Sequence, residues 1–281
     1  MTVIIGRGRL GQACAQYFKK ARVLSRSQCD ITTMASINTA LDPRDRLIIN
    51  TAAYTAVDDC EKNQKDAYAI NALGPLHLAR WCHKNQASLI HISTDYVFDG
   101  KKETPYTESD PPNPINYYGY SKLIGEQQVI SACDSAYIFR IQWLFGPTSA
   151  GRPDDFVVKI RDLATKKSEL TVINDQVGSP SYSLDIASAL YSLFGDQISL
   201  EHGLYHLRAS GYASWYSLAC ASIQLPPRYP VRITPVSSAA YPQPAQRPLN
   251  SRLSTAKLDP IIRLRHWQAA LAAYLLPAGS V

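Results

Sequence analysis

The segment Tyr117-Tyr-Gly-Tyr-Ser-Lys122 places phenols and an ammonium close together in the sequence. Asn116 precedes the segment and is a residue type that caps helices, so a helix is predicted to begin near Tyr117 or Tyr118. Residues four apart share one face of a helix. Tyr118 and Lys122 therefore can meet one substrate together, whereas Tyr117 and Tyr120 point elsewhere.

This pair predicts proton transfer to a carbonyl oxygen. A free phenol has a pKa near 10, and a neighbouring ammonium can lower it by roughly one to three units. We therefore expect the pKa of Tyr118 to be lowered by Lys122, which makes the phenol a proton donor or acceptor near neutral pH. Thr94 follows an apolar run and could donate to the same oxygen. The lysine could also hold the ribose of a nicotinamide cofactor, and the three residues then suit hydride transfer.

A tyrosine–lysine pair can also merely decorate a helix, and the first residues of the chain argue against that here. A short β-branched run ends in Gly6, Gly8 and Gly11, in G-x-G-x-x-G order. An apolar stripe of helical period follows, so the glycines lie on a strand-to-helix turn. Such a turn bends tightly, lets backbone approach a pyrophosphate and aims a helix N-terminus at the anion. We expect a dinucleotide there.

Arginines near this turn predict which dinucleotide binds. The second strand ends at Ser25 and Arg26, where an NAD-preferring site usually places an acid. Arg7 and Arg9 lie in the glycine turn itself. Guanidinium groups pair bidentately with phosphate, so three arginines around one ribose would suit a 2′-phosphate. We therefore predict NADPH as the cofactor, with NADH as the alternative.

Apolar strands alternate with helical stretches through the first half of the chain. The pattern predicts an α/β fold, a doubly wound parallel sheet (Rossmann) with a second, smaller α/β substrate domain. The predicted dinucleotide-binding domain covers residues 1–146, with a return segment at about 177–202. Residues 147–176 and 203–281 form the interleaved substrate-binding domain. A polar loop at 147–156, a helix at 156–167, a strand at 169–176 and a final helix near Trp267 are expected within it.

Composition excludes several classes of protein. The 281 residues carry 29 basic and 23 acidic side chains, and the modest net charge of +6 has no long basic run. Nucleic-acid binding is therefore not expected. The six cysteines include no C-x-x-C pair, which predicts reduced thiols and no cysteine zinc site. We expect a cytoplasmic protein with no membrane span, no metal and a monomeric or homodimeric state.

The chain resembles the dTDP-4-dehydrorhamnose reductase family of the extended short-chain dehydrogenase/reductase superfamily. The glycine turn and Tyr118 to Lys122 carry the resemblance to the superfamily. More specific stretches carry the resemblance to the family, and they run in order through almost the whole chain: NTAAYTAVDDCE, INALGPLHLA, STDYVFDG, YYGYSKLIGE, FRIQWLFG, DQVGSP and RPLNSRL.

The resemblance implies that NAD(P)H reduces the 4-keto group of dTDP-4-dehydro-L-rhamnose to give dTDP-L-rhamnose. It implies catalytic roles for Thr94, Tyr118 and Lys122. The implied cofactor contacts, beside Tyr118 and Lys122, are Gly6, Gly8, Arg9, Leu10, Gly11, Asp30, Ile31, Ala53, Tyr54 and Thr55. Arg26 is a further predicted cofactor contact, from the 2′-phosphate argument above. The implied contacts to the nucleotide sugar are Val57, Thr94, Asp95, Tyr96, Trp143 and Arg247. Tyr96 and Trp143 could pack on apolar faces of sugar or base, or belong to the core; Arg247 could pair with the diphosphate or face water.

Three alternatives stay open from the sequence. The substrate could be a different nucleotide 4-ketosugar. The chain could be a non-catalytic NADP-binding regulatory subunit, although all three catalytic residue types are present. An epimerase or dehydratase of the same superfamily is a further possibility, but the segment Thr94-Asp-Tyr lacks the adjacent acidic pair that a dehydratase uses.

Overall fold

The structure is a computed structural model that describes residues 1–148, 155–195 and 200–276. Its centre is a six-stranded sheet in the order β10-β5-β4-β3-β1-β2, and every pairing is parallel. The strands are β1 Thr2–Ile5, β2 Arg22–Leu24, β3 Leu47–Asn50, β4 Ser88–Thr94, β5 Ala136–Ile141 and β10 Gly203–His206. The predicted doubly wound parallel sheet is confirmed.

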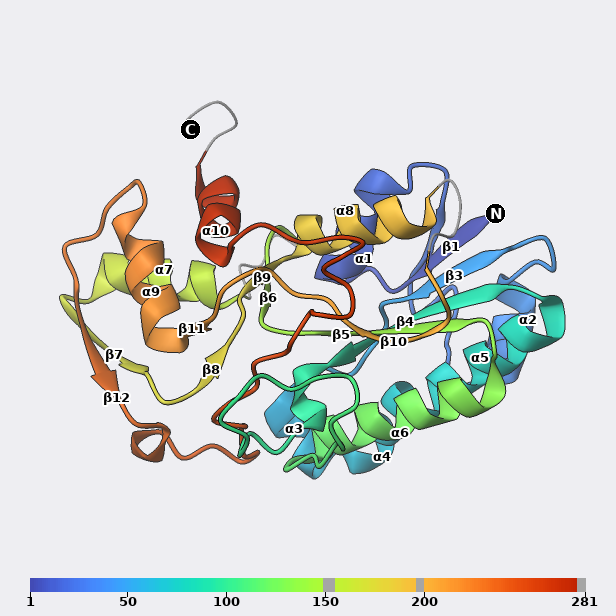
Figure 1. The fold of residues 1–281 in the computed structure, drawn as a ribbon, viewed down its shortest axis with the longest axis horizontal. Coiled ribbons are helices and arrows are strands. Elements are labelled where there is room, and N and C mark those ends of the chain that lie inside the picture. The colour runs from blue at the N-terminus through green and yellow to red at the C-terminus, as the bar shows by residue number, and fades with distance from the viewer. Residues whose placement is uncertain (149–154, 196–199, 277–281) are drawn as a thin grey trace.

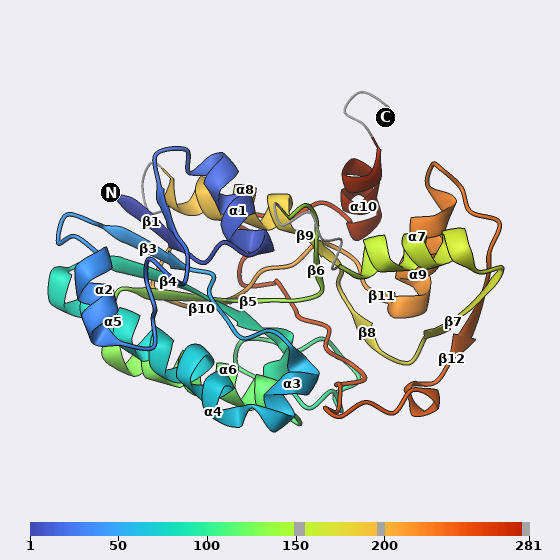
Figure 2. The ribbon, with the colours of Figure 1, turned by 180° about the vertical axis from the view of Figure 1, so that it is seen from behind.

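Helices cover both faces of this sheet (Figures 1 and 2). One face carries α1 Arg9–Tyr17 and α8 Ser183–Phe194, and the other carries α2 Met34–Ala40, α5 Gly74–Asn85 and α6 Tyr117–Ala132. Successive side chains of a strand point to opposite faces. In β1, accordingly, Ile4 packs beneath α1 and α8, while Val3 and Ile5 pack beneath the other helices.

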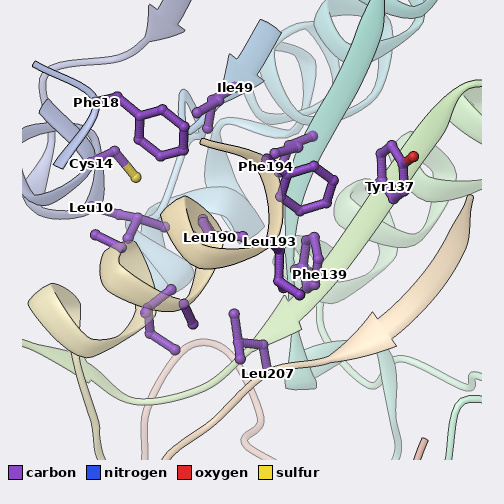
Figure 3. Packing of buried hydrophobic residues seen from close by; sticks show 14 of the residues in the cluster. Leu10, Cys14, Phe18, Ile49, Tyr137, Phe139, Leu190, Leu193, Phe194 and Leu207 are labelled. Carbon is purple, nitrogen blue, oxygen red and sulfur yellow. The ribbon is translucent and has the colours of Figure 1, made fainter. Parts of the chain in front are cut away.

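The apolar stripe predicted for the first helix lies against the return segment. Leu10 and Cys14 of α1 pack in one buried cluster with Leu190 of α8 and Phe139 of β5 (Figure 3). Through α8 the return segment packs on the first domain. This contact between distant segments fixes α1, and with it the glycine turn, against the sheet.

Residues 64–85, between β3 and β4, form three joined helical pieces: α4 Gln64–Tyr68, a π-helical turn η1 Ala69–Leu73, and α5. A shorter helix, α3 Val57–Lys62, precedes them. Asn71 of η1 is fully buried and accepts from the Tyr54 backbone N–H at 2.8 Å. Its amide donates to the Tyr54 carbonyl at 3.1 Å and to Ser121 Oγ at 3.0 Å. The π turn thus ties the loop after β3 to α6, as such turns often do at functional sites.

A second unit lies beyond one end of the sheet (Figure 1). Its elements are α7 Phe156–Lys166, β7 Glu169–Ile173, β8 Val177–Gly178, β11 Ala213–Ser214, α9 Trp215–Gln224, β12 Arg232–Val236, the 3₁₀ turn η3 Ser238–Ala240 and α10 Trp267–Leu275. β12 pairs with β7, and Ile160 and Ala219 pack on that pair from α7 and α9. The helix, strand and final helix predicted here are present, and residues 149–154 of the predicted polar loop lie outside the described residues.

The predicted boundary at residue 203 differs from the structure. β10 begins there, pairs with β5 through four residues and forms the edge of the central sheet. The strand has only the short run Gly203–His206, followed by a proline-rich region, so its composition resembled the second unit. The return segment therefore extends through β10.

Cysteine placement agrees with reduced thiols: all six are free, and five are buried. Burial raises the pKa of the Cys14 thiol to about 12, which keeps it unreactive near neutral pH. No helix of the described residues reaches the length and apolar character that crossing a bilayer requires.

Candidate active site

A cleft of about 820 Å³ opens where the strands of the parallel sheet end. That size suits a cofactor or substrate site, and the position is where doubly wound sheets bind their ligands. All predicted site residues except Gly11 and Arg247 line it. They are Gly6, Gly8, Arg9, Leu10, Arg26, Asp30, Ile31, Ala53, Tyr54, Thr55, Val57, Thr94, Asp95, Tyr96, Tyr118, Lys122 and Trp143.

The glycine turn has the geometry that a dinucleotide requires. Gly6 has a φ of +103°, a conformation that favours glycine. A side chain at Gly11 would collide with the Gly6 carbonyl, so α1 can approach β1 only with glycine there. Gly8 is different, because a side chain there would meet no protein atom within 4 Å. Its open side faces the cleft at the N-terminus of α1, where free N–H groups favour an anion.

The three arginines predicted to surround the ribose are not gathered. Arg9 Nε donates to the Gly146 carbonyl at 2.9 Å, and its guanidinium lies 3.7 Å from the Asp155 carboxylate. Asp155 caps α7, so Arg9 connects the glycine turn to the second unit. Arg7 donates to the Val23 carbonyl at 3.3 Å and stays exposed. Arg26 is exposed at the cleft and remains available to a ligand.

Asp30 and Ile31 line the cleft, and Arg26 lies close to Asp30. Asp30 Oδ1 accepts from Thr32 N–H at 3.0 Å and from Thr32 Oγ1 at 2.7 Å. These hydrogen bonds lower the pKa of Asp30, so it is a carboxylate near neutral pH. Ile31 is buried against Gly74 at the start of α5.

Tyr118 lies in the first turn of α6, where the sequence analysis placed it. Asn116 caps the helix by accepting from Gly119 N–H at 2.8 Å. A side chain at Gly119 would collide with the Tyr96 carbonyl, so the helix start packs directly on the turn after β4. This close approach lets the Tyr118 phenol hydrogen-bond to Thr94 at the end of that strand. Two of the three predicted catalytic residues thus touch.

Burial, and not Lys122, dominates the titration of Tyr118. The surrounding protein raises the pKa of the phenol by desolvation, and the hydrogen bond to Thr94 only partly opposes that. The predicted lowering of this pKa by the ammonium is wrong for the unliganded protein. Lowering would require the charged amine to outweigh the loss of water around the phenol, and it does not. Tyr118 therefore keeps its proton throughout the neutral range.

Lys122 is buried beneath the end of β4, with 2% of its surface exposed. Its Nζ donates to the Ile92 carbonyl at 2.6 Å and lies 3.4 Å from His91 Nε2. Burial lowers the pKa of Lys122 to about 8, and nearby Glu126 partly counters that. The amine therefore changes charge close to physiological pH.

His91, Asn50 and the Glu126–Arg140 pair support Lys122, and no sequence motif marks them. Asn50 Oδ1 accepts from Ala52 N–H at 3.1 Å, which turns its amide Nδ2 toward His91 Nδ1 at 3.1 Å. Burial keeps the pKa of His91 well below its usual value, so the ring is neutral. Glu126 and Arg140 form a buried bidentate ion pair, with atoms 2.6 and 2.9 Å apart. The one sequence feature that could have indicated this buried polar group is a histidine, His91, within the apolar run of β4.

Aromatic and acidic residues line the other end of the cleft. The rings of Tyr96 and Tyr118 meet edge to face with centroids 5.7 Å apart. Burial raises the pKa of Asp95 to about 6, although Ser251 and Gln142 hydrogen-bond to it. Trp143 follows β5 and stacks on Trp215 of α9, which the sequence analysis did not single out.

Arg247 does not line the cleft. Its guanidinium binds the Asp58 carboxylate of α3 with two hydrogen bonds of 2.6 and 2.8 Å. It also donates to the Tyr96 phenol oxygen. The Arg247 guanidinium already binds a carboxylate here, and its pairing with a diphosphate stays a prediction. The side chain instead holds the C-terminal segment against α3.

Comparisons with known proteins agree with this geometry. Residues 1–278 match the family described as RmlD substrate binding domain. The dTDP-4-dehydrorhamnose reductase of Mycobacterium tuberculosis is 40% identical over 99% of this chain and 93% of its own length. The chain belongs to the RmlD family.

Two further RmlD relatives bear on substrate and cofactor. The dTDP-4-dehydrorhamnose reductase of Bacillus anthracis, solved in complex with NADP, has a TM-score of 0.88 and 31% identity over 97% of each chain. A probable dTDP-4,6-dihydroxy-2-methyloxan-3-one 4-ketoreductase of Streptomyces antibioticus is 34% identical over 95% of this chain and 90% of its own length.

The buried Lys122 predicts a pH dependence of stability. Its pKa is about 8 in the folded protein and near 10.5 in an unfolded chain. Between these values the unfolded chain binds more protons, so the free energy of unfolding rises with pH by up to about 3 kcal/mol from this group. Urea titrations at pH 7.5 and 10 should show this rise in the wild type relative to Lys122→Met. Equal changes in the two proteins would contradict the assignment.

Proposed function

We propose that this protein is an oxidoreductase that uses NADPH to reduce the 4-keto group of dTDP-4-dehydro-L-rhamnose, giving dTDP-L-rhamnose. The observation that carries the proposal is the convergence of Thr94, Tyr118 and Lys122 on the cleft that the glycine turn borders. Family membership and the reductases among its relatives support the same reaction.

The cleft suits a dinucleotide on structural grounds. The open side of Gly8 and the first turn of α1, which has no acidic residue, can receive a pyrophosphate. We infer that Asp30 and Arg26 bind the adenosine ribose and its 2′-phosphate. Ala53, Tyr54 and Thr55 are proposed to contact the rest of the cofactor, because all five residues line the cleft. NADPH supplies hydride when bound, and the relative solved with NADP supports this choice.

The chain's own residues supply the proton and the orientation. The keto oxygen is proposed to lie beside the Thr94 and Tyr118 hydroxyls, because these two groups hydrogen-bond to each other at the end of β4. As negative charge develops on that oxygen, Tyr118 donates its proton to it, and the C4 carbonyl becomes a hydroxyl. The Lys122 ammonium stabilises the phenolate that forms, because it lies one helical turn further along the same face.

The second unit is proposed to hold the nucleotide sugar, together with Val57, Asp95, Tyr96 and Trp143. A different dTDP-linked 4-ketosugar is the second candidate substrate, because the Streptomyces antibioticus relative carries such a name. Assays of NADPH consumption with dTDP-4-dehydrorhamnose and with related dTDP-4-ketosugars test the proposal. No consumption with any of them would overturn it and favour a binding subunit.

Tyr118→Phe should lower kcat by about a hundredfold or more, because it removes the proton donor while keeping the ring. NADPH affinity, measured by calorimetry, should change little. Tyr120→Phe is a matched control, since its exposed ring points away from the cleft. Turnover that survives in Tyr118→Phe would remove this residue from the acid role.

The pH profile of kcat/KM should fall above about pH 8, where Lys122 loses its charge. Tyr118 makes no contribution there, because burial keeps its pKa higher. Lys122→Arg keeps a charged group, so its basic limb should move beyond about pH 10 even if its rate is lower. An unmoved limb in that variant would show that another group titrates.

Arg26→Ala should raise KM for NADPH about tenfold and leave KM for NADH nearly unchanged, because only NADPH has a 2′-phosphate for the guanidinium. Arg44→Ala is a control, since Arg44 is an exposed arginine paired with Asp42 outside the cleft. An equal effect of Arg26→Ala on both cofactors would contradict this role.

A further inference from the structure

The indole of Trp143 is held between two neighbours. Its ring stacks on Trp215 with centroids 3.7 Å apart and planes 6° from parallel. A Cβ built on Gly178 would lie 2.6 Å from Trp143 Cε2 and 2.8 and 2.9 Å from the two flanking ring atoms. Because the inner ring-fusion atom is nearest, Gly178 lies against a face of the indole. A Cβ on the side of Trp215 would meet the stacked Trp215 ring, yet all three of its nearest atoms belong to Trp143, so we infer that Gly178 covers the opposite face.

The backbone of Trp143 adopts a strained conformation that the surrounding contacts must hold in place. Its φ of +46° lies in the left-handed region, which costs a bulky residue energy. Neighbouring groups hold the segment: the Trp143 carbonyl accepts from Ser181 N–H at 3.1 Å, and Gln142 Nε2 donates to the Ser251 carbonyl at 2.6 Å. These contacts fix the backbone, whereas Gly178 and Trp215 fix the ring.

Trp215 is itself held firmly by the second unit. It is the first residue of α9, which Ser214 caps by accepting from Ser217 N–H at 3.0 Å. Its Nε1 donates to Gln176 Oε1 at 3.2 Å, and Phe156 of α7 lies 4.7 Å from its ring. The second unit therefore extends a fixed aromatic ring to the residue that follows β5 of the first.

Gly178 and Trp215 together form a clamp on the Trp143 indole, and this clamp limits how Trp143 can contact a substrate. Both faces of the indole are covered, so the expected packing of this face on sugar or base is not possible in this arrangement. Trp143 and Trp215 both line the cleft, so Trp143 presents its edge. Within the described part of the chain its Nε1 has no hydrogen-bond partner, which leaves a donor for a sugar hydroxyl.

We propose that Trp215 is a specificity-determining positioning residue, which clamps Trp143 edge-on and so sets the width of the sugar site. This inference rests on the proposed function. In this proposal the second unit contributes to catalysis through Trp215 of α9. Trp215 does not need to contact the reacting carbon, because it acts through Trp143.

Kinetic variants test the clamp. Trp215→Leu should raise KM for dTDP-4-dehydrorhamnose about tenfold, the effect of losing one aromatic pair, and leave KM for NADPH unchanged. Trp215→Phe should restore most of the loss. Gly178→Ala, which drives a methyl group into the indole face, should reproduce the rise in KM.

A double variant tests whether Trp215 acts through Trp143. If it does, Trp143→Leu combined with Trp215→Leu should have the same KM as Trp143→Leu alone. Trp81→Leu is the matched control, because Trp81 of α5 is a buried tryptophan that lies outside the cluster of Trp215 and does not line the cleft. Additive effects, a KM for NADPH that rises equally, or the same rise in Trp81→Leu would overturn the proposal.

Binding and spectroscopy separate this proposal from the function itself. Calorimetry should show weaker binding of dTDP-L-rhamnose to Trp215→Leu, with the affinity for dTDP unchanged. If the wild type binds neither, the proposed function fails. The clamp can then be tested by near-ultraviolet circular dichroism, which detects the coupling of stacked tryptophans. Trp143→Leu and Trp215→Leu should each abolish the same signal. Two different residual spectra would contradict the clamp.

Discussion

The placement of half-buried Tyr118 and buried Lys122 on one face of α6 is the constraint on which the site depends. Both side chains are polar, so removing them from water is costly unless each has a hydrogen-bond partner. Thr94 meets the phenol, and the Ile92 carbonyl meets the amine. Both partners belong to the end of β4, so the start of α6 must press against that strand end.

Several features far apart in the sequence serve this contact. Gly119 removes the side chain that would hold α6 away from the Tyr96 carbonyl. Asn71 ties the loop after β3 to α6 through Ser121. The buried Glu126–Arg140 pair places a carboxylate one turn beyond Lys122, where it keeps some positive charge on the amine. A buried amine destabilises the folded protein, and its retention is typical of sites where function and stability oppose each other.

The sequence predicted the elements well and the electrostatics less well. The glycine order, the cap at Asn116 and the four-residue spacing from Tyr118 to Lys122 are local patterns, and local patterns determine the helix start and the strand-to-helix turn. The predicted pKa of Tyr118 was wrong because desolvation depends on what packs around the ring, and spacing does not reveal that. Arg9 was expected near a phosphate, and Arg247 near a diphosphate or in water. The fold brings each beside a carboxylate from a distant segment, Asp155 and Asp58 respectively, which no local pattern indicates. Trp215 and His91 carry no motif, and only the folded chain brings them to the site.

The central claim is that burial keeps the Tyr118 phenol protonated while Lys122 is the group that titrates. Tyrosine labelled with carbon-13 at Cζ reports the charge of each phenol directly by nuclear magnetic resonance, and comparison with Tyr118→Phe assigns the signal. The account predicts that the Tyr118 resonance does not titrate below about pH 11 in the unliganded protein. A midpoint between about pH 7 and 9 would contradict it and would restore an acidified phenol as the basis of the mechanism.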